Sequence, residues 1–372
     1  MTAHRNPPPP GIDHPWEHAS EPGTVTEVAP GILWARLPLP MRLDHVNVYI
    51  LDEGDHWSLI DTGLKWATSR AVWQALLAGP LAAKPVGRVI LTHHHPDHIG
   101  LAGWFAERGA EIWATRIAWL FGRMLTLDHH HRPTPQHLAF RRRAGMPENL
   151  LAAYAQEPPF NFSACVAPIP LGFRAIDEGD EITMAGRQWT VRIGHGHAPS
   201  HATFWSQDGL VLAGDQILPG ISSNISVYPT EPEADPLGDW LESCARLRAH
   251  ARPGHLVLPG HKLPFRGLGF RLTQLIENHE NALARIEADL RDGPLTAAEA
   301  FPAIFKRPIG AGEYGMALGE AVAHMNHLLR RGRIARDAGA APGGAWKFAL
   351  ADGQSAEIAP YSVDCGTTAQ RS

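Results

Sequence analysis

Short segments in which apolar and polar residues alternate with a period of two recur along the chain, and this spacing predicts β-strands. In the first part of the chain the pattern predicts three strands and then a helix, at residues 32–37, 45–51, 57–60 and 67–77. A second series predicts three strands and then a helix, at residues 181–193, 202–206, 210–213 and 238–249. Two β-rich halves with flanking helices predict an α/β fold in which two packed sheets lie between layers of helices.

The two halves are separated by a segment whose pattern is mostly helical. We assign a helical insertion to about residues 116–165, with helices predicted at 117–127, 135–144 and 148–155. An insertion at this place could form a lid over a functional site. Between residues 116 and 150 it has two acidic residues and the arginines Arg116, Arg123, Arg132, Arg141, Arg142 and Arg143. This charge would suit an anionic substrate, although a solvated helix face has the same composition.

After residue 265 the pattern predicts a separate C-terminal module. Its elements are a long amphipathic helix from Leu272 to Leu290, a second helix with Thr296 as N-cap, a third helix at 315–331, and a hairpin at 333–336 and 346–350. We therefore expect a flexible N-terminal arm, a catalytic domain, this module and a tail, at residues 1–24, 25–265, 266–352 and 353–372.

The candidate chemistry is concentrated in the segment 92–100, which reads T-H-H-H-P-D-H-I-G. It places four metal-binding side chains in the pattern H-x-H-x-D-H after an apolar run: His93, His95, Asp97 and His98. Because proline cannot continue a β-ladder, we expect a strand that ends at Leu91 or Thr92 and then a turn at Pro96. Imidazole and carboxylate together suit zinc, iron or manganese. A surface cluster is the alternative, because the chain has 22 histidines; the strand-and-turn context favours a metal site.

This pattern resembles the metal-binding motif of the metallo-β-lactamase superfamily, and four further segments resemble that family's motifs in the expected order. They are L-I-D-T-G at 59–63, G-H-G-H-A-P-S-H at 194–201, V-L-A-G-D at 211–215 and L-P-G-H at 258–261. The resemblance covers about residues 25–265 and implies the family's αββα sandwich.

Carried over residue by residue, the resemblance implies two divalent metal ions, zinc first, with iron or manganese as alternatives. The implied ligands are His93, His95 and His197 for one ion, and Asp97, His98 and His261 for the other. Asp215 would bridge the ions, and Asp61 would support the metal loop from outside the ligand set. The sequence departs from the family's G-H-T-P-G-H pattern at Ala198 and Ser200, which puts details of that loop in doubt.

Some histidines beside the motifs have no assigned ligand role. His94 alternates away from the cluster and is interpreted as structural. His195 and His201 would either orient a neighbouring ligand or simply pack, and the sequence leaves both interpretations open.

The implied chemistry is hydrolysis by a hydroxide that bridges the metal ions. Asp97 and Asp215 are the candidate catalytic residues, and Asp97 could also relay a proton to the leaving group. The loop after Asp215 offers oxyanion donors, Ser222, Ser223, Asn224 and Tyr228. Of these, we select Asn224 and Tyr228 as candidate substrate-binding residues.

The C-terminal pattern resembles the winged-helix module of a subgroup of this family's hydrolases, which includes a lactamase-like endoribonuclease. The chain as a whole resembles glyoxalase-II-like and lactamase-like endoribonuclease members of the family. Charge argues against nucleic acid as the first choice of partner, because residues 267–340 hold nine Lys plus Arg and nine Asp plus Glu. A local patch remains near the wing, at Arg330, Arg331, Arg333 and Arg336. We interpret the module as packing, as a dimer contact or as a wall of the substrate pocket.

Composition excludes several classes of protein. The 372 residues are 44% hydrophobic and 19% charged with a formal net charge of −5, as in ordinary globular enzymes. Three cysteines without a C-x-x-C spacing, Cys165, Cys244 and Cys365, argue against a disulfide framework or a thiolate metal site. No apolar run is long enough for a membrane span, and prolines stand at 7–10 in place of an apolar leader. We therefore expect a cytoplasmic protein without a membrane partner.

The leading functional hypothesis is a dinuclear metal-dependent hydrolase that acts on an ester-type bond of a small molecule, a thioester or lactone. A phosphodiesterase or endoribonuclease is the first alternative, favoured by the winged-helix resemblance and by the arginines. An iron-dependent oxidoreductase resembling persulfide dioxygenases is the second. A non-catalytic scaffold would be expected to have lost ligands, and this sequence retains the whole implied set.

Overall fold

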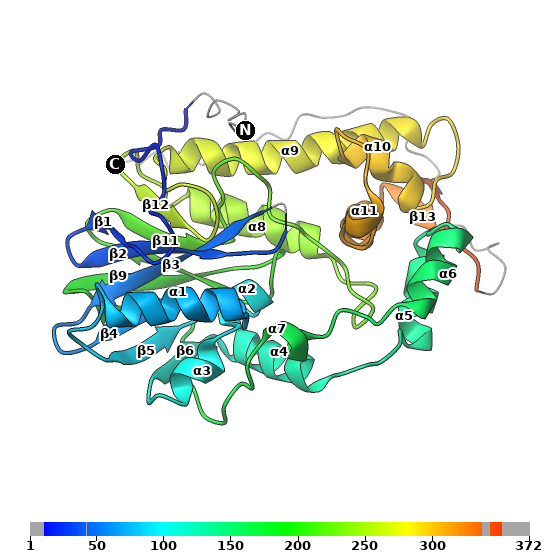
Figure 1. Cartoon of the computed structure of the whole chain (residues 1–372). Coiled ribbons are helices and arrows are strands. Elements are labelled where there is room, and N and C mark those ends of the chain that lie inside the picture. Colours follow the sequence, from blue (N-terminus) through cyan, green and yellow to red (C-terminus); the bar gives the residue numbers. More distant parts are fainter. Residues whose placement is uncertain (1–10, 42, 337–342, 352–372) are drawn as a thin grey trace, which may run out of the picture.

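The computed structural model describes residues 11–41, 43–336 and 343–351. Within these residues the chain forms two mixed sheets that pack face to face, with helices on both outer faces, and a C-terminal module of helices and a small sheet (Figure 1). This confirms the predicted α/β sandwich. The predicted tail at 353–372 lies outside the described residues, as does Cys365.

The first sheet has the strand order β1-β2-β3-β4-β5-β6-β7. Its strands span Thr26–Ala29, Ile32–Pro38, His45–Asp52, Trp57–Ile60, Val86–Ile90, Glu111–Ala114 and Arg174–Ala175. Pairing is antiparallel from β1 to β4 and parallel from β4 to β7. Neighbouring side chains point to opposite faces, so Trp34 lies in the core between the sheets and Ala35 in the core beneath the outer helices.

The second sheet has the strand order β12-β11-β10-β9-β8. Its strands, from β8 to β12, span Glu181–Met184, Arg187–Gly194, His201–Ser206, Leu210–Gly214 and Leu256–Pro259. The predicted single strand at 181–193 is wrong, because the chain turns at Ala185 and Gly186 to make the β8–β9 hairpin. Both turn residues have positive φ, 49° and 69°, as a two-residue hairpin turn requires.

Helices cover the outer faces of both sheets (Figure 1). On the first sheet lie α1, α2 and α3, and on the second lie α8 and α9, with bounds Ala67–Ala78, Pro96–Ile99, Ala102–Ala106, Pro236–Arg248 and Leu268–Asp289. Trp73 of α1 and Trp240 of α8 are fully buried anchors of these two layers. The turn predicted at Pro96 is instead the first residue of α2, a position that suits proline because its amide hydrogen would not be used there.

The segment predicted as an insertion contacts both the sandwich and the C-terminal module. It contains α4, α5, α6 and α7, which span Arg116–Leu127, Pro135–Arg143, Glu148–Gln156 and Phe162–Cys165. In Figure 1, α4 and α7 lie at the lower right end of the sandwich, whereas α5 and α6 lie further right, beside the module. The amide of Ala298 donates to Ala144 O at 3.0 Å, and that of Trp346 donates to Arg143 O at 2.7 Å. Met146 and Leu151 are buried in the core that the module shares with the second sheet.

The C-terminal module begins with α9 and continues through short helices to α11. Its remaining elements, in chain order, are η1 Ala298–Ala300, α10 Phe301–Ile304, η2 Ala311–Glu313, α11 Tyr314–Arg330, β13 Ile334–Arg336 and β14 Phe348–Leu350. Thr296 and Glu299 cap each other, since each backbone amide donates to the other side chain. The second helix predicted from Thr296 is broken into η1 and the single-turn α10, because Pro302 supplies no amide hydrogen to continue a helix.

The first described residues pack on the side of the molecule that contains the second sheet. Ile12 is buried in its core, and Asp13 pairs with Arg266 in an antiparallel bridge. In the described part of the chain, no helix combines the length and apolar character needed to cross a bilayer.

Candidate metal centre

The candidate ligands lie just after the ends of strands from both sheets, and two of them, Asp97 and His98, belong to the short helix α2. The segment 93–98 follows β5, His197 follows β9, Asp215 follows β11 and His261 follows β12. The strands β9, β11 and β12 run in the same direction and end at one edge of the second sheet. Packing of the first sheet on the second brings the residues after β5 to the same place, so that side chains up to 168 positions apart in the sequence, from 93 to 261, lie together. Gly260 lets the backbone after β12 pass close to the Asp215 side chain, because a Cβ at this position would lie 2.2 Å from Asp215 Oδ1.

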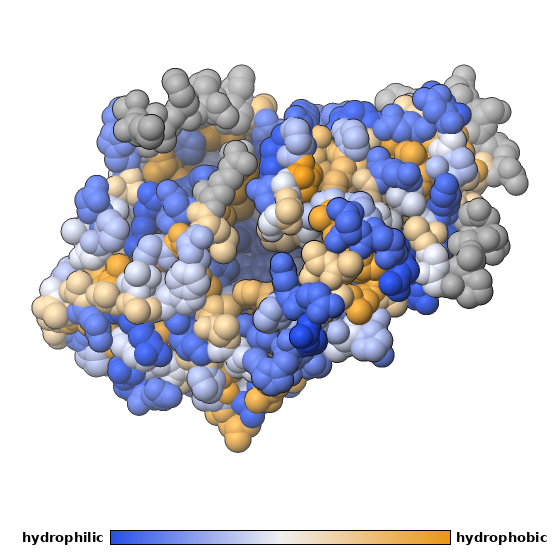
Figure 2. Space-filling view, turned by 45° about the vertical axis from the view of Figure 1, so that its right-hand side comes forward, coloured by the Kyte–Doolittle hydropathy of each residue, from blue (hydrophilic) through white to orange (hydrophobic). Residues whose placement is uncertain are grey.

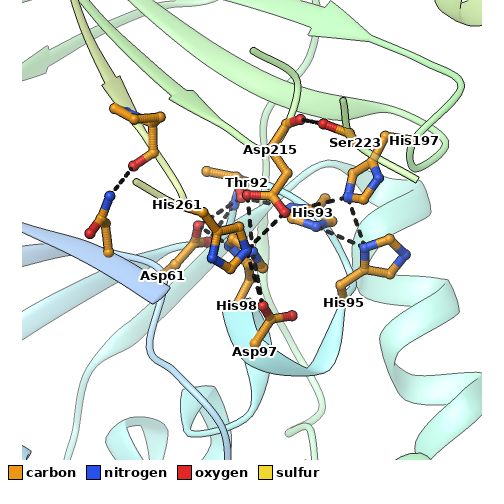
Figure 3. A network of polar contacts seen from close by, with 12 residues as sticks. Asp61, Thr92, His93, His95, Asp97, His98, His197, Asp215, Ser223 and His261 are labelled. Atoms are coloured by element: carbon orange, nitrogen blue, oxygen red, sulfur yellow. Dashed lines mark hydrogen bonds and ion pairs between the residues drawn. The ribbon is translucent and has the colours of Figure 1, made fainter. Parts of the chain in front are cut away.

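Two groups of side chains converge, and Asp215 lies between them (Figure 3). In the first group, His95 Nδ1 lies 3.0 Å from both His93 Nε2 and His197 Nε2. In the second group, Asp97 Oδ2 lies 3.3 Å from His261 Nε2 and 3.6 Å from His98 Nε2.

Asp215 contacts both groups through its two oxygens. Oδ2 lies 3.1 Å from His261 Nε2 and 3.7 Å from His197 Nε2, and Oδ1 lies 3.4 Å from His98 Nε2. The structure thus brings together all seven predicted ligands, with Asp215 in the position of a bridge.

The outward ring nitrogens of four histidines determine which nitrogen faces the centre. His93 Nδ1 donates to Thr92 Oγ1 at 2.9 Å, and His98 Nδ1 donates to Asp61 Oδ2 at 2.7 Å. His197 Nδ1 donates to the backbone oxygen of Asn224 at 2.8 Å, and His261 Nδ1 to that of His45 at 2.7 Å. In its neutral form, each of these four rings therefore directs an Nε2 lone pair inward.

Converging lone pairs and carboxylates repel one another unless a cation or a proton lies between them. His98 Nε2 and Asp215 Oδ1 are buried and have no hydrogen-bond partner among the described residues. The donor set of imidazole nitrogens and carboxylate oxygens is the one that zinc, iron and manganese accept. The residues of this centre therefore fit a metal ion.

Asp61 supports the loop that carries the first ligands, as predicted from its motif. Its Oδ1 accepts the Thr92 amide at 2.8 Å, and its Oδ2 accepts Thr92 Oγ1 and His98 Nδ1, both at 2.7 Å. Asp61 has a φ of 63°, a conformation that aspartate and asparagine tolerate better than most residues. One buried carboxylate thus orients two residues of the metal loop.

The electrostatics differ between the two groups. Burial, reinforced by the neighbouring rings, holds the pKa of His93 and His95 well below the ordinary value, so these rings are neutral ligands at neutral pH. Burial alone would also lower the pKa of His98 and His261, but Asp215 and Asp97 outweigh it. The pKa of His98 is raised well above its ordinary value, and that of His261 is raised to about 10. A metal ion would replace these protons on binding.

The loop after β11 links the centre to the C-terminal module. Asn224 accepts from His197 through its backbone oxygen and donates its Nδ2 to Glu320 of α11 at 2.9 Å. Arg271 of α9 is buried and donates to the backbone oxygens of Leu218 and Ile221 at 2.5 and 2.7 Å. The module therefore holds the loop that orients a candidate ligand.

Other predicted residues have more specific places than the sequence indicated. His201 stacks on His93 with ring centroids 4.5 Å apart and accepts the Asp215 amide through Nε2 at 3.1 Å, so it positions two ligands. His94 packs against Phe121 and Phe162, in keeping with a structural role. Tyr228 is 52% exposed.

The candidate oxyanion donors are partly used elsewhere. Ser222 Oγ is bound to His279, Ser223 Oγ donates to Asp215 O, and Asn224 Nδ2 donates to Glu320. Sequence reasoning missed the supporting roles of Thr92 and His45. Thr92 lies inside the T-H-H-H segment, where its position before a ligand was a usable signal, whereas His45 contributes a backbone oxygen, which no residue type reveals.

Comparison with known proteins agrees with this geometry. Residues 41–261 match the family described as the metallo-beta-lactamase superfamily, and residues 283–351 match a domain described as metallo-beta-lactamase-like, C-terminal. The probable metallo-hydrolase YqjP of Bacillus subtilis (strain 168) is 28% identical over 312 residues, which are 80% of this chain and 92% of that protein.

Two solved structures are similar over nearly the whole chain. A beta-lactamase domain protein from Burkholderia ambifaria is 34% identical with a TM-score of 0.82, covering 91% of this chain and 97% of that one. A metallo-beta-lactamase family protein from Thermus thermophilus is 28% identical with a TM-score of 0.72, covering 87% of this chain and 99% of that one.

Proposed function

The chain belongs to the metallo-beta-lactamase superfamily and is a metal-dependent hydrolase of that fold, and from this premise we propose that it uses two divalent ions, zinc in the first instance, to hydrolyse a small thioester or lactone. The observation that carries the proposal is the inward direction of the histidine lone pairs. Four rings are held by outward hydrogen bonds so that Nε2 faces the two carboxylates.

Two bound divalent ions supply a nucleophilic hydroxide near neutral pH and polarise the scissile carbonyl oxygen. The chain's own residues set the geometry of this step. Asp215 lies between the two ligand groups and contacts both. The Asp97 side chain is 21% exposed, so one of its oxygens can exchange a proton with a leaving group at the surface.

The enclosure of the site supports a small substrate. The α5–α6 part of the insertion is hydrogen-bonded to the C-terminal module and shares its hydrophobic core. Figure 2 shows the surface hollowed between the sandwich and these elements. A substrate in this hollow would be bounded by the insertion and by the module, which favours a small molecule over a long polymer.

The wing arginines give little support to a nucleic-acid substrate. Each contacts an acidic residue or its backbone: Arg331 pairs with Glu280, Arg333 with Glu287 and Arg336 with Glu233, while Arg330 donates to the Glu233 backbone. Paired arginines release fewer counterions on binding a phosphate backbone. Several arginines of the insertion also have hydrogen-bond or ion-pair partners; Arg123, for example, donates to the backbone oxygen of Ile169. An anionic substrate therefore stays a prediction.

The proposal is tested with a substrate panel. Metal-loaded protein is assayed with acyl thioesters, lactones, bis-p-nitrophenyl phosphate and single-stranded RNA, beside His93→Ala and the matched control His56→Ala, a histidine paired with exposed Asp55 outside the centre. We expect thioester or lactone turnover that is lost only in His93→Ala. Turnover of the phosphodiesters alone would make the enzyme a phosphodiesterase, and a fully active His93→Ala would contradict the metal centre.

Metal analysis separates the hydrolase from the oxidoreductase alternative. We expect two zinc ions per chain in protein purified without added metal. Iron as the main metal, with oxygen uptake on glutathione persulfide, would replace the hydrolase proposal by the persulfide dioxygenase one.

A further inference from the structure

A line of hydrogen bonds outside the metal centre joins a serine to two histidines. Ser222 lies on the loop after β11, His279 on α9 and His324 on α11. Ser222 Oγ lies 3.1 Å from His279 Nε2, and His279 Nδ1 lies 3.3 Å from His324 Nε2. His324 Nδ1 ends the line 2.8 Å from the backbone oxygen of Glu320.

The direction of these bonds follows from their last member. A carbonyl oxygen only accepts, so His324 carries its hydrogen on Nδ1 and presents a lone pair at Nε2. His279 must then donate from Nδ1, which leaves its own Nε2 lone pair to accept the Ser222 hydroxyl. At 3.1 Å this nitrogen is nearer to Ser222 Oγ than the other acceptor, the Ser223 backbone oxygen at 3.5 Å. Both rings are buried, and burial lowers the pKa of His279 to about 3 and that of His324 to about 4, so both are neutral at pH 7, as this direction requires.

We propose that Ser222 is a second nucleophile of this protein, which accepts an acyl or phosphonyl group from an activated ester without a metal ion. It has the arrangement that marks an activated nucleophile: an exposed hydroxyl, a base within hydrogen-bond reach, and a third group that orients the base. None of the three side chains belongs to the metal ligand set, so this inference does not depend on the metal-dependent activity.

The step is an acyl transfer. Ser222 Oγ forms a bond to the carbonyl carbon, its proton passes to His279 Nε2, and the bond to the alcohol leaving group breaks as that proton is delivered to the leaving oxygen. With a fluorophosphonate, an Oγ–P bond forms, fluoride leaves, and the proton passes through His279 to solvent. Because the line ends in a carbonyl and not a carboxylate, and because burial makes His279 a weak base, we expect slow reaction and a long-lived adduct.

An alkyl fluorophosphonate tests the proposal on the full-length, metal-loaded protein. After incubation, the modified peptide is identified by mass spectrometry. We expect one phosphonyl group on Ser222. Ser163 is the internal control, because its Oγ lies 3.3 Å from Nδ1 of the exposed His129, whose ring contact among the described residues is the equally exposed His131. Absence of label on Ser222, or equal labelling of Ser163, would overturn the proposal.

Variants then separate a reactive serine from a packing contact. Ser222→Ala should abolish the label. His279→Gln should lower the labelling rate by at least about tenfold, a smaller loss than removal of a general base usually causes, because His279 is a weak base. His324→Asn, whose amide can still donate to the Glu320 oxygen, should slow labelling while leaving the near-ultraviolet circular dichroism unchanged. A labelling rate in His279→Gln equal to that of the parent protein would show that the line of bonds does not activate Ser222.

Discussion

Replacing Asp61 by asparagine should weaken metal binding through the protons of its neighbours. The substitution keeps the side-chain size and suits the φ of 63°. Three donors face the carboxylate: the Thr92 amide, Thr92 Oγ1 and His98 Nδ1. A carboxamide offers one oxygen and places an NH2 group against at least one of these donors. A buried unpaired donor costs about 1–3 kcal/mol.

The conflict can also be relieved by moving the His98 proton from Nδ1 to Nε2. That ring would then direct a hydrogen at Asp215 Oδ1, 3.4 Å away, and could not bind a cation through Nε2. Loss of a group that orients a metal-binding histidine typically lowers affinity by about 10–100-fold, which is about 1.4–2.8 kcal/mol. We expect this loss at the ion held by Asp97, His98 and His261.

Competition with a chromophoric chelator measures the effect as metal released per chain. The matched control is Asp55→Asn, which removes a similar Asp–His pair in which the Asp55 side chain is 88% exposed and which should change nothing measurable. Two ions bound to Asp61→Asn with affinities within twofold of the parent would refute the assignment of Asp61 as the group that sets the His98 tautomer.

Three further predictions follow from single features. Gly100→Ala should destabilise the fold by about 1–3 kcal/mol, because the added Cβ would lie 2.4 Å from Gly63 O and 2.6 Å from Pro96 O. Urea unfolding tests this, with Gly220→Ala as the control, since a Cβ added at Gly220 meets open space. Burial raises the pKa of Glu320 from 4.5 to about 7, so its contribution to the free energy of unfolding declines as pH rises between these values. Glu320→Gln should remove that decline, and unfolding curves that stay parallel to the parent's from pH 4.5 to 7 would exclude it. Chelation of bound metal should lower the melting temperature, because an ion present at 100 times its Kd adds about 2.7 kcal/mol to the free energy of unfolding. Equal melting temperatures of the metal-loaded and chelated protein would count against a metal in this centre.

The C-terminal module takes part in the metal centre without supplying a ligand. Glu320 holds Asn224, whose backbone oxygen orients His197, and Arg271 holds the start of the same loop. Loops that carry functional residues are precise only when other elements fix them.

Local pattern was sufficient for most of the secondary structure and for the identity of the candidate ligands. Strands such as Trp57–Ile60 and helices such as Glu148–Gln156 were predicted to within a residue or two, because the alternation of buried and exposed faces is set by each element's own geometry. The errors arose where a single residue changes the backbone, at the Ala185–Gly186 turn, at Pro96 and at Pro302.

The order of residues along the chain was enough to identify which side chains could bind a metal, since H-x-H-x-D-H and its companion motifs are short segments whose chemistry depends on residue type and spacing. The folded structure was needed to establish which nitrogen of each ring faces the centre, because that depends on oxygens of Thr92, Asp61, Asn224 and His45. It was also needed to show that Arg331, Arg333 and Arg336 are paired with acidic residues and that Ser222 contacts His279, which in turn contacts His324. The residues in these contacts can be far apart in the sequence: His279 and His324 are separated by 45 positions, and His45 and His261 by 216. A local pattern does not encode the packing that brings such residues together.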